Sequence, residues 1–514
     1  MTSLIATGGF IKFETVSEAM KAAGIDYQEN NQRGILVWFD NVRDKDFFSS
    51  LQPYQIVNRI PSINMICRKA PFVGLIQRVA PLFPEYFTFL PTSFILPLKN
   101  QQFIAAVNKK KTRYIVKPDC GSLGKGITII EPGDTYEPQP TLAIAQEYIE
   151  STTLHNTKFD MRIYALVASV HPELTIYVYR DGIARFCSAT QDQHNLFSQI
   201  TNTAVNRQNP DLANVNSITR RVESVFEEMA SQRSTSKLNE NDNSEKETEP
   251  NEDNNEKSEE NESETENKKE TDNENDNNSE VQDEKGSETT NTNEKSSKKP
   301  VDIGALWKRI DNAIVFTIMS ATNFILKGTQ SSCPSYGLPR CFQILGFDVL
   351  LDKDLNPYIL EVNFRPSLEY DTEEEKNMKI EMLSQAMKIA APFQMLQSTV
   401  SDRTTPWNDK MWISYLQHNE DVFKRVERCR DLAVKESKFE KVYPTKDPIN
   451  KDYLRVFNSL KKLQPKMGMS YNLPDISEPP KLRISSPQLK PLITKPVKKR
   501  SKSPSRKKQK LLPL

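Results

Sequence analysis

The chain has 514 residues, of which 37% are hydrophobic and 27% are charged, and its formal net charge is +1. This length is enough for roughly two to four domains, and the low hydrophobic content indicates that part of the chain does not fold. We expect no signal peptide and no membrane span, because no apolar run approaches the roughly 20 residues that a span needs. The six cysteines lack C-x-x-C spacing and predict reduced thiols rather than disulfides or a zinc site.

The charge is distributed unevenly along the chain. Residues 240–296 contain 22 acidic residues and 6 lysines, whereas residues 495–510 contain nine basic residues and no acidic one. With so few apolar residues to bury, we expect residues 231–300 to be a disordered acidic insertion and residues 471–514 a disordered basic tail. The tail is typical of a polyanion-binding or nuclear-import segment and equally of a solubilising one. The rest of the chain carries a net charge of about +8.

The first folded part is predicted to be a small α/β unit within residues 35–110. It contains the strand Ile35-Leu36-Val37-Trp38 and a helix over residues 72–83. The next part is richer in strands, which we expect at residues 114–117, 126–130, 142–149, 161–167, 175–179 and 184–186. Between the last two of these strands, Arg180-Asp181-Gly182 predicts a hairpin turn.

A glycine-rich loop lies between two of these strands, from Lys117 to Ile127. Its three glycines let backbone N–H groups approach an anion, and its two lysines add positive charge. The loop is not a Walker A motif, because Asp119 occupies the position of the first glycine and Gly126 that of the Ser/Thr. Taken alone, an ordinary hairpin loop explains this segment better than a phosphate site does.

Charged residues alternate along one predicted strand. Lys158, Asp160 and Arg162 fall on one face, and apolar residues fall on the other. Such a face either lines a phosphate site, for which the arginine fork is well suited, or forms a salt-bridge ladder at a sheet edge. The alternation leaves both interpretations open.

Residues after the insertion predict a helix over 303–327, two strands over 346–350 and 357–363, and helices over 375–392 and 409–441. The turn at residues 352–357 joins the two strands into a hairpin. Asp348 lies on the first strand, and Glu361 and Asn363 share one face of the second. Because buried carboxylates are costly unless they are paired, this cluster predicts a cation, and its oxygen ligands suit magnesium. The alternative is a surface hairpin whose acidic residues face water.

These motifs occur in an order that resembles the tubulin tyrosine ligase-like family, and most of all its tubulin polyglutamylases. The order is the glycine loop, Gln146-Glu147-Tyr148-Ile149, Lys158-x-Asp160-x-Arg162, Arg185, Thr201-Asn202, Gly346-Phe347-Asp348 and Glu361-Val362-Asn363. The resemblance covers about residues 35–210 and 303–448.

The resemblance implies an α+β fold: an ATP-grasp ligase core with a long disordered insertion, a helical C-terminal extension and a disordered basic tail. The implied parts are an N-terminal subdomain (1–110), a central ATP-grasp subdomain (111–230), the insertion (231–300), a C-terminal ATP-grasp subdomain with the metal site (301–400), a basic helical extension (401–470) and the tail (471–514).

The resemblance also implies a role for each matching position. The ATP phosphates and ribose would be bound by Lys117, Leu123, Gly124, Lys125, Gly126, Lys158, Asp160, Thr201 and Asn202. The adenine would be held by Gln146, Glu147, Tyr148 and Ile149. Magnesium would be bound by Asp348, Glu361 and Asn363, and the carboxylate of the incoming amino acid by Arg185 and Lys379. Catalysis, by charge stabilisation and positioning, would depend on Lys117, Lys158, Arg162 and Glu361.

Three positions depart from the family pattern. Residues 199–203 lack the family's His and Tyr around Thr201-Asn202, and Arg365 stands where a small residue is more common. Leu306, rather than a lysine, precedes Trp307. None of these departures removes a predicted metal or phosphate ligand.

The implied reaction is ATP-dependent amide formation between a protein carboxylate and a free amino acid, through an acyl phosphate. The expected partners are ATP, Mg²⁺, tubulin or microtubules through acidic C-terminal tails, and glutamate, with glycine and tyrosine as alternatives; we expect no nucleic acid or membrane partner. Basic residues in the helices of residues 409–441 form either a microtubule-facing surface or a solvated face. The rival interpretations are an ATP-grasp ligase acting on another acidic protein or a small molecule, and a non-catalytic microtubule-binding protein with a degenerate core.

The resemblance implies a cytoplasmic protein of the cytoskeleton, with cilium, flagellum or basal body as further sites, and the basic tail adds the nucleus as a further expected location. The acidic insertion suggests one hypothesis of its own. Its Glu-rich composition is similar to that of the expected acceptor, and its tether gives it a high local concentration. It would then act as an internal competitor or be modified itself, whereas the simpler alternative is a spacer without catalytic effect.

Overall fold

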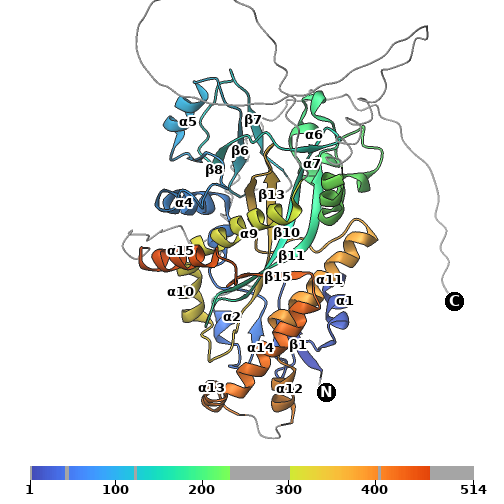
Figure 1. The fold of residues 1–514 in the computed structure, drawn as a ribbon, viewed down its shortest axis with the longest axis vertical. Coiled ribbons are helices and arrows are strands. Elements are labelled where there is room, and N and C mark those ends of the chain that lie inside the picture. The colour runs from blue at the N-terminus through green and yellow to red at the C-terminus, as the bar shows by residue number, and fades with distance from the viewer. Residues whose placement is uncertain (1–2, 41–45, 121–123, 232–300, 403–406, 464–514) are drawn as a thin grey trace, which may run out of the picture. The chain divides into compact units, whose positions relative to one another are not determined.

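The computed structural model describes residues 3–40, 46–120, 124–231, 301–402 and 407–463 (Figure 1). These residues form both helices and strands, which confirms the prediction of a mixed α and β fold. The predicted insertion, apart from residue 231, and the predicted tail lie outside the described residues. The domain boundaries and the name ATP-grasp therefore stay predictions.

The N-terminal sheet is parallel and has the strand order β2-β1-β3-β4. Its strands are β1 (Leu4–Gly8), β2 (Ile25–Tyr27), β3 (Leu36–Trp38) and β4 (Ile56–Val57). The helix α1 (Glu14–Ala22) connects β1 to β2, and parallel strands require a crossover of this kind. The predicted strand at residues 35–38 is therefore confirmed as β3.

A second, antiparallel sheet has the order β5-β8-β6-β7. Its strands are β5 (Ser93–Leu96), β6 (Tyr114–Pro118), β7 (Thr128–Ile130) and β8 (Ala143–Glu147). The strand β5 comes before residue 110 in the chain, yet it pairs with β8. The helices α4 (Lys69–Val79) and α5 (Asn100–Val107) contact this sheet, and α2 (Asp46–Ser49) and α3 (Asn64–Cys67) come before them in the chain. The glycine-rich loop connects β6 to β7, as the sequence predicts.

The central sheet has the order β12-β11-β10-β13-β14, and in addition β15 pairs with β11 and β9 pairs with β10. The strands are β9 (Thr153–Leu154), β10 (Thr157–Ser169), β11 (Thr175–Phe186), β12 (Thr219–Arg221), β13 (Gln343–Leu351), β14 (Pro357–Asn363) and β15 (Phe439–Tyr443). The antiparallel register places Arg162 opposite Asp348, and Asp348 opposite Glu361. The predicted hairpin of residues 346–363 is confirmed, and the long insertion separates its two strands from β10 in the sequence.

Each face of the central sheet carries a hydrophobic core, because successive residues of β10 point to opposite sides. Met161 and Ile163 pack into the core that includes α9 (Ile303–Ser320), whereas Tyr164 and Leu166 pack into the core that includes α11 (Glu373–Ala390) and the N-terminal sheet. Figure 1 shows both helices over this sheet. Other helices are α6 (Leu196–Gln199), α7 (Thr203–Asn206), α10 (Thr322–Ser332), α12 (Gln394–Ser401), α13 (Asp409–His418), α14 (Glu420–Lys435) and α15 (Asn450–Leu463).

Side chains fix where several of these helices begin. The carboxylate of Asp302 accepts a hydrogen bond from the backbone N–H of Ala305 at the start of α9. Thr372 accepts one from Glu375 at the start of α11, whose first turn is acidic. These contacts satisfy N–H groups that the helix itself leaves unpaired, and the acidic residues complement the helix dipole.

The predicted hairpin turn at Arg180-Asp181-Gly182 is wrong, because β11 runs without interruption through these residues. The turn residues sit in the strand because their polar groups find partners there. Asp181 is fully buried, accepts from the guanidinium of Arg221 on β12 and accepts from the backbone N–H of Gly182. The chain instead reverses between β10 and β11, at residues 170–174.

Two long helix predictions are divided in the structure. The predicted helix over residues 303–327 separates into α9 and α10 at Ala321. The predicted helix over residues 409–441 separates into α13 and α14, and its last residues form β15. All six cysteines are free. None of the described helices is long and apolar enough to cross a membrane.

Candidate active site

A cavity of about 420 Å³ lies where the second sheet faces the central sheet. Sixteen of the residues that the sequence predicts for the site line it: Lys117, Gly124, Lys125, Gln146, Glu147, Tyr148, Ile149, Lys158, Asp160, Arg162, Arg185, Thr201, Asn202, Asp348, Glu361 and Asn363. They come from β6, β8, β10, β11, β13, β14 and the segments between these strands. The fold thus collects at one place residues that lie up to 246 positions apart, from Lys117 to Asn363.

Two lysines reach this cavity from different sheets. The Nζ of Lys117 on β6 donates to Oε1 of Gln146 at 3.1 Å, and the Nζ of Lys158 on β10 donates to the hydroxyl of Tyr148 at 2.8 Å. Among the described residues, neither ammonium group has a carboxylate oxygen within the 4.0 Å of an ion pair. Desolvation by the surrounding protein lowers the pKa of each lysine to about 8. Both remain mostly protonated at neutral pH and are poorly compensated by the protein itself.

Four charged side chains form a network beside the lysines. Arg162 binds Asp348 with two nitrogens, and Nη2 of Arg185 lies 2.9 Å from Oδ2 of Asp348. Arg185 also binds Asp160 through two hydrogen bonds of 2.7 and 2.6 Å. Burial raises the pKa of Asp348, but the two arginines outweigh it and lower that pKa to about 2. The protein itself thus supplies positive charge to Asp348, so a metal ion is not needed to compensate it, contrary to the sequence argument.

Glu361 lies opposite Asp348 on β14, and its Oε2 is 3.1 Å from Nζ of Lys69. The amide of Asn363, oriented so that both of its atoms are satisfied, donates to Oε1 of Glu361 at 3.0 Å and accepts from Nη2 of Arg162 at 3.2 Å. The three side chains predicted as metal ligands therefore lie together on the β13–β14 hairpin, and their binding of a metal stays a prediction. Among the residues described, no three His, Cys, Asp or Glu side chains are grouped to hold a metal ion.

The glycine-rich loop packs against the segment that contains Thr201 and Asn202. Gly124 has a positive φ of 73°, and a Cβ at this position would collide with Cγ2 of Val205 on α7. Asn202 caps α7, because its side-chain oxygen accepts from Ala204 N at 3.0 Å and from Val205 N at 3.2 Å. The side chain of Asn202 is therefore engaged in holding α7 against the loop, while the residue still lines the cavity.

Two of the described site residues, Gly126 and Lys379, are not in the cavity lining. Leu123 lies outside the described residues. Gly126 has a φ of 74°, and a Cβ at this position would be 3.0 Å from Cγ of Pro118. Lys379 is buried on α11, where its Nζ contacts Oε1 of Glu375 at 2.6 Å and the backbone oxygen of Glu369. The structure brings Arg185, but not Lys379, to this cavity.

Lys69, the first residue of α4, is not among the site residues expected from the sequence. It lines the cavity and pairs with Glu361, and its charge contributes to the lowered pKa of Lys117. Lys69 belongs to a stretch that matches the family, so the resemblance supplied a signal for it. Arg365 and Ser367 also line the cavity, directly after β14.

The lining fits a nucleotide. Lys69, Lys117, Lys125, Lys158, Arg162 and Arg185 bring positive charge, and Ile115, Ile127, Ile149, Leu350 and Leu360 add apolar surface. Cationic side chains suit phosphate oxygens, and an apolar slot suits a planar base. The two carboxylates and the amide of the β13–β14 hairpin are the oxygen donors that magnesium prefers, although Asp348 and Glu361 are both in ion pairs.

Comparison with known proteins agrees with this geometry. Residues 48–249 and 263–399 match the model of the tubulin-tyrosine ligase family. The chain belongs to this family. Similar curated proteins include the mouse tubulin polyglutamylase TTLL13 (28% identical over 389 residues), the mouse tubulin polyglutamylase TTLL6 (28% over 386 residues) and the human tubulin polyglutamylase TTLL7 (28% over 396 residues).

The alignments include 73–74% of this chain but only 37–40% of each of these relatives. The part that matches the family model includes every residue that lines the cavity. The family resemblance drawn from the ordered motifs is therefore confirmed, and the properties of the whole relatives are not transferred with it.

Proposed function

We propose that this member of the tubulin-tyrosine ligase family is an ATP-dependent ligase with an ATP-grasp core, which adds an amino acid to glutamate side chains in acidic tubulin C-terminal tails. The observation that carries the proposal is the pair of desolvated lysines, Lys117 and Lys158, which lack a carboxylate partner among the described residues. Two desolvated ammonium groups at one cavity favour an anionic ligand, because an unpaired charge is costly in a dry site. The phosphates of ATP have the required charge.

In this proposal, the two sheets hold ATP between them. Lys69, Lys117, Lys158 and Arg162 would bind phosphate oxygens, with Gly124 and Lys125 above them, and residues 146–149 would hold the base. ATP would supply the phosphoryl group that activates the acceptor carboxylate, and the amine of the incoming amino acid would displace phosphate from the resulting acyl phosphate. The part of the protein would be to position the groups and to stabilise negative charge, because the cavity offers no side chain that must act as a covalent nucleophile.

Magnesium is part of the same proposal. Asp348, Glu361 and Asn363 would be its protein ligands, and the ion would neutralise phosphate charge. For Glu361 to bind the ion, Lys69 would exchange its carboxylate partner for a phosphate. Arg162 and Arg185 would keep Asp348 ionised, because they lower its pKa to about 2, and their hydrogen bonds would keep its carboxylate oriented.

We propose glutamate as the added amino acid, which makes the reaction a polyglutamylation. The names of the similar proteins, all tubulin polyglutamylases, support this choice. Arg185 is the candidate for binding the carboxylate of the free amino acid. In this structure it already binds Asp160 and Asp348, so the bound amino acid would compete with these two side chains.

The test is incubation of the protein with microtubules, ATP, magnesium and one labelled amino acid at a time. The proposal predicts incorporation of glutamate, dependent on ATP, and loss of it in Glu361→Gln. Incorporation of glycine or tyrosine alone would overturn the choice of amino acid. If no amino acid is incorporated while the protein still binds microtubules, the ligase proposal fails and a scaffold role replaces it.

A further inference from the structure

The two lysines of the proposed nucleotide cavity are held by neutral side chains from one short segment of the chain. Gln146 lies on β8 and Tyr148 is two positions further on, and both residues line the cavity. The Nζ of Lys117 donates to Oε1 of Gln146 at 3.1 Å, and the Nζ of Lys158 donates to the hydroxyl of Tyr148 at 2.8 Å. One segment of the second sheet therefore contacts both ammonium groups.

A chain of hydrogen bonds determines which atom Gln146 presents to Lys117. The pairing of β5 with β8 places Ser93 opposite Gln146, and both residues are buried. The hydroxyl of Ser93 donates to the backbone oxygen of Pro91 at 2.6 Å and accepts from Nε2 of Gln146 at 3.1 Å. Because a hydroxyl has a single proton, Ser93 acts as an acceptor toward Gln146. The amide oxygen of Gln146 therefore faces the lysine.

The hydroxyl of Tyr148 is oriented in the same way. It donates its proton to the backbone oxygen of Gln199 at 2.9 Å, which leaves a lone pair for Lys158. The ammonium group of Lys158 also lies 3.9 Å from the centre of the Tyr148 ring, within the range of a cation–π contact. The phenol thus connects the end of the second sheet, β10 of the central sheet and the last residue of α6.

The backbone of this segment is fixed as well. The N–H of Glu147 donates to the oxygen of Thr92 at 2.9 Å, and the N–H of Tyr148 donates to the oxygen of Arg113 at 2.9 Å. The guanidinium of Arg113 lies 5.0 Å from the centre of the Tyr148 ring. Side chains on paired backbone hold a position more precisely than side chains on a free loop. Gln146 and Tyr148 can therefore fix the two ammonium groups in place.

The two acceptors are neutral, which preserves the charge of the lysines. A carboxylate in their place would cancel much of this charge, whereas an amide or phenol oxygen orients an ammonium group and leaves its net charge for a ligand. Charged and titratable groups that act on the two lysines from the surrounding elements are Lys69, Glu150, Asp160, Cys187, Asp348 and Glu361.

We propose that Gln146 and Tyr148 are positioning residues, whose side chains aim the ammonium groups of Lys117 and Lys158 at the phosphates of ATP. The inference rests on the proposed function, because it concerns the phosphate site of that ligase. It gives these two side chains a task separate from holding the base. Neither side chain contacts a reacting atom in this proposal, and each acts through its lysine.

The first experiment compares a ligand that has a base with one that has none. Tyr148→Phe removes the hydroxyl and keeps the ring. Isothermal titration measures the binding of a non-hydrolysable ATP analogue and of tripolyphosphate to the full-length protein. Both affinities should fall by about tenfold, the loss expected for one hydrogen bond to a charged group. A weaker affinity for the ATP analogue with an unchanged affinity for tripolyphosphate would overturn the proposal, because the hydroxyl would then contact the base.

A double-mutant cycle tests whether the hydroxyl acts through the lysine. In Lys158→Met, the additional change Tyr148→Phe should have no further effect on tripolyphosphate affinity, because the group that it positions is gone. An equal loss in both backgrounds would overturn the proposal. If Lys158→Met does not fold, Gln146→Met and Lys117→Met form a second cycle with the same expectation.

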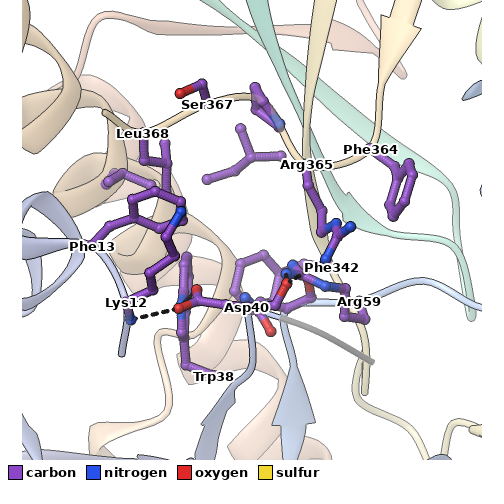
Figure 2. Close-up of a pocket in the computed structure, with 14 residues that line it drawn as sticks. Lys12, Phe13, Trp38, Asp40, Arg59, Phe342, Phe364, Arg365, Ser367 and Leu368 are labelled. Carbon is purple, nitrogen blue, oxygen red and sulfur yellow. Dashed lines mark hydrogen bonds between the residues drawn. The ribbon is translucent and has the colours of Figure 1, made fainter. Parts of the chain in front are cut away.

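Lys12→Met is the matched control for this cycle. Lys12 lines a neighbouring cavity of about 360 Å³ (Figure 2). Its removal also takes one positive charge from the protein, but in this background the full effect of Tyr148→Phe should remain. Loss of the effect here as well would overturn the proposal, because the coupling would then depend on charge in general and not on Lys158.

A measurement without nucleotide separates this inference from the proposed function. The pH dependence of acetylation by acetic anhydride, followed by mass spectrometry, gives the pKa of Lys158. A hydrogen bond to the charged form raises the pKa of a lysine, so Tyr148→Phe should lower that of Lys158 below its value of about 8. An unchanged pKa would overturn the proposal. If the unmodified protein binds neither the ATP analogue nor tripolyphosphate, the proposed function fails, and the pKa of Lys158 still decides whether Tyr148 positions it.

Discussion

At the scale of single residues, the proposed nucleotide cavity is defined by two lysines whose ammonium groups are desolvated by the surrounding protein. Lys117 and Lys158 project from different sheets toward the same cavity, and their shortest hydrogen bonds go to an amide oxygen and a phenol. Asp348, in contrast, is fully compensated by Arg162 and Arg185. An anionic ligand would therefore compensate the charges of the two lysines. The carboxylate of Asp348 is already compensated by its arginines and needs no ligand.

The lysines predict a pH dependence of ATP binding. Because the pKa of each is lowered to about 8, both lose their charge as the pH rises through 8, and ATP affinity should fall from pH 7 to pH 9.5. Lys117→Met should weaken ATP binding at pH 7 and should make the decrease in ATP affinity between pH 7 and pH 9.5 smaller. Isothermal titration with a non-hydrolysable ATP analogue measures both effects. An affinity that stays constant up to pH 9.5 would contradict the prediction.

The same lysines predict the opposite trend for the stability of the nucleotide-free protein. Their ordinary pKa is 10.5, so between about pH 8 and pH 10.5 the unfolded chain binds more protons than the folded one. Stability against unfolding from this source therefore rises with pH in that window. Urea titrations at pH 8 and pH 9.5 should show a smaller rise for Lys117→Met than for the unmodified protein. An equal rise in both would indicate that Lys117 is not desolvated.

The ion pairs of Asp348 predict that substituting this residue lowers the free energy of unfolding more than substituting Glu361 on the same hairpin does. Asp348→Asn removes the shared partner of two arginines and should lower the free energy of unfolding by about 3 kcal/mol, as for a broken buried ion pair. Glu361→Gln should cost less than about 1 kcal/mol, because the side chain of Glu361 is 33% exposed. Both variants should lose ligation. Urea denaturation with equal losses in the two variants would show that Asp348 is not the structural member of the pair.

At the scale of elements, strand register is what assembles the cavity. The pairing of β10 with β13 places Arg162 opposite Asp348, and the pairing of β10 with β11 places Asp160 opposite Arg185. A shift of one residue in either pairing would turn these side chains to the other face of the sheet, into a hydrophobic core. The loop between β6 and β7 covers the same site from the opposite sheet, and α7 holds that loop in place.

The loop can be tested with two glycines that both have positive φ. Gly124→Ala introduces a Cβ that collides with Val205, whereas Gly133→Ala introduces one with no atom within 4 Å. Both substitutions carry a comparable backbone cost of roughly 1–3 kcal/mol, but only the first displaces the loop from α7. Gly124→Ala should raise KM for ATP by about tenfold, and Gly133→Ala should leave it unchanged. Equal KM values for ATP in the two variants would show that the position of this loop does not affect nucleotide binding.

At the scale of the whole molecule, the uneven distribution of charge along the chain predicts how fast the protein associates with an acidic partner. Residues 240–296 carry a net charge of −16, and the chain outside this segment and the basic tail carries about +8. Oppositely charged surfaces speed association, and salt screens them. The acidic segment lies outside the described residues, so the prediction rests on its composition and its covalent tether alone.

Deletion of residues 240–296 tests the segment as an internal competitor. The deletion should raise kcat/KM for an acidic acceptor at about 50 mM salt and have a smaller effect at about 300 mM, where the Debye length is shorter. Replacing the segment with an uncharged Gly/Ser linker of the same length is the matched control and should act like the deletion. Unchanged activity at low salt in both proteins would leave the segment as a spacer.

Taken alone, the sequence determined the features that depend on local periodicity and order. The alternation at Lys158, Asp160 and Arg162 was confirmed as one face of a strand, and Asp348, Glu361 and Asn363 as one hairpin, because side-chain alternation follows from strand geometry. The order of the motifs identified the family, which the family model confirmed. ATP-grasp, magnesium and the individual site roles stay predictions.

Only the tertiary structure decided which charges meet. It paired Asp348 with two arginines, Glu361 with Lys69 and Lys379 with Glu375. It also drew Arg180-Asp181-Gly182 into β11, because Arg221 on another strand compensates Asp181. Periodicity tells which face of a strand a side chain occupies. The counter-charge that it meets depends on pairing between segments far apart in the chain, which no local pattern encodes.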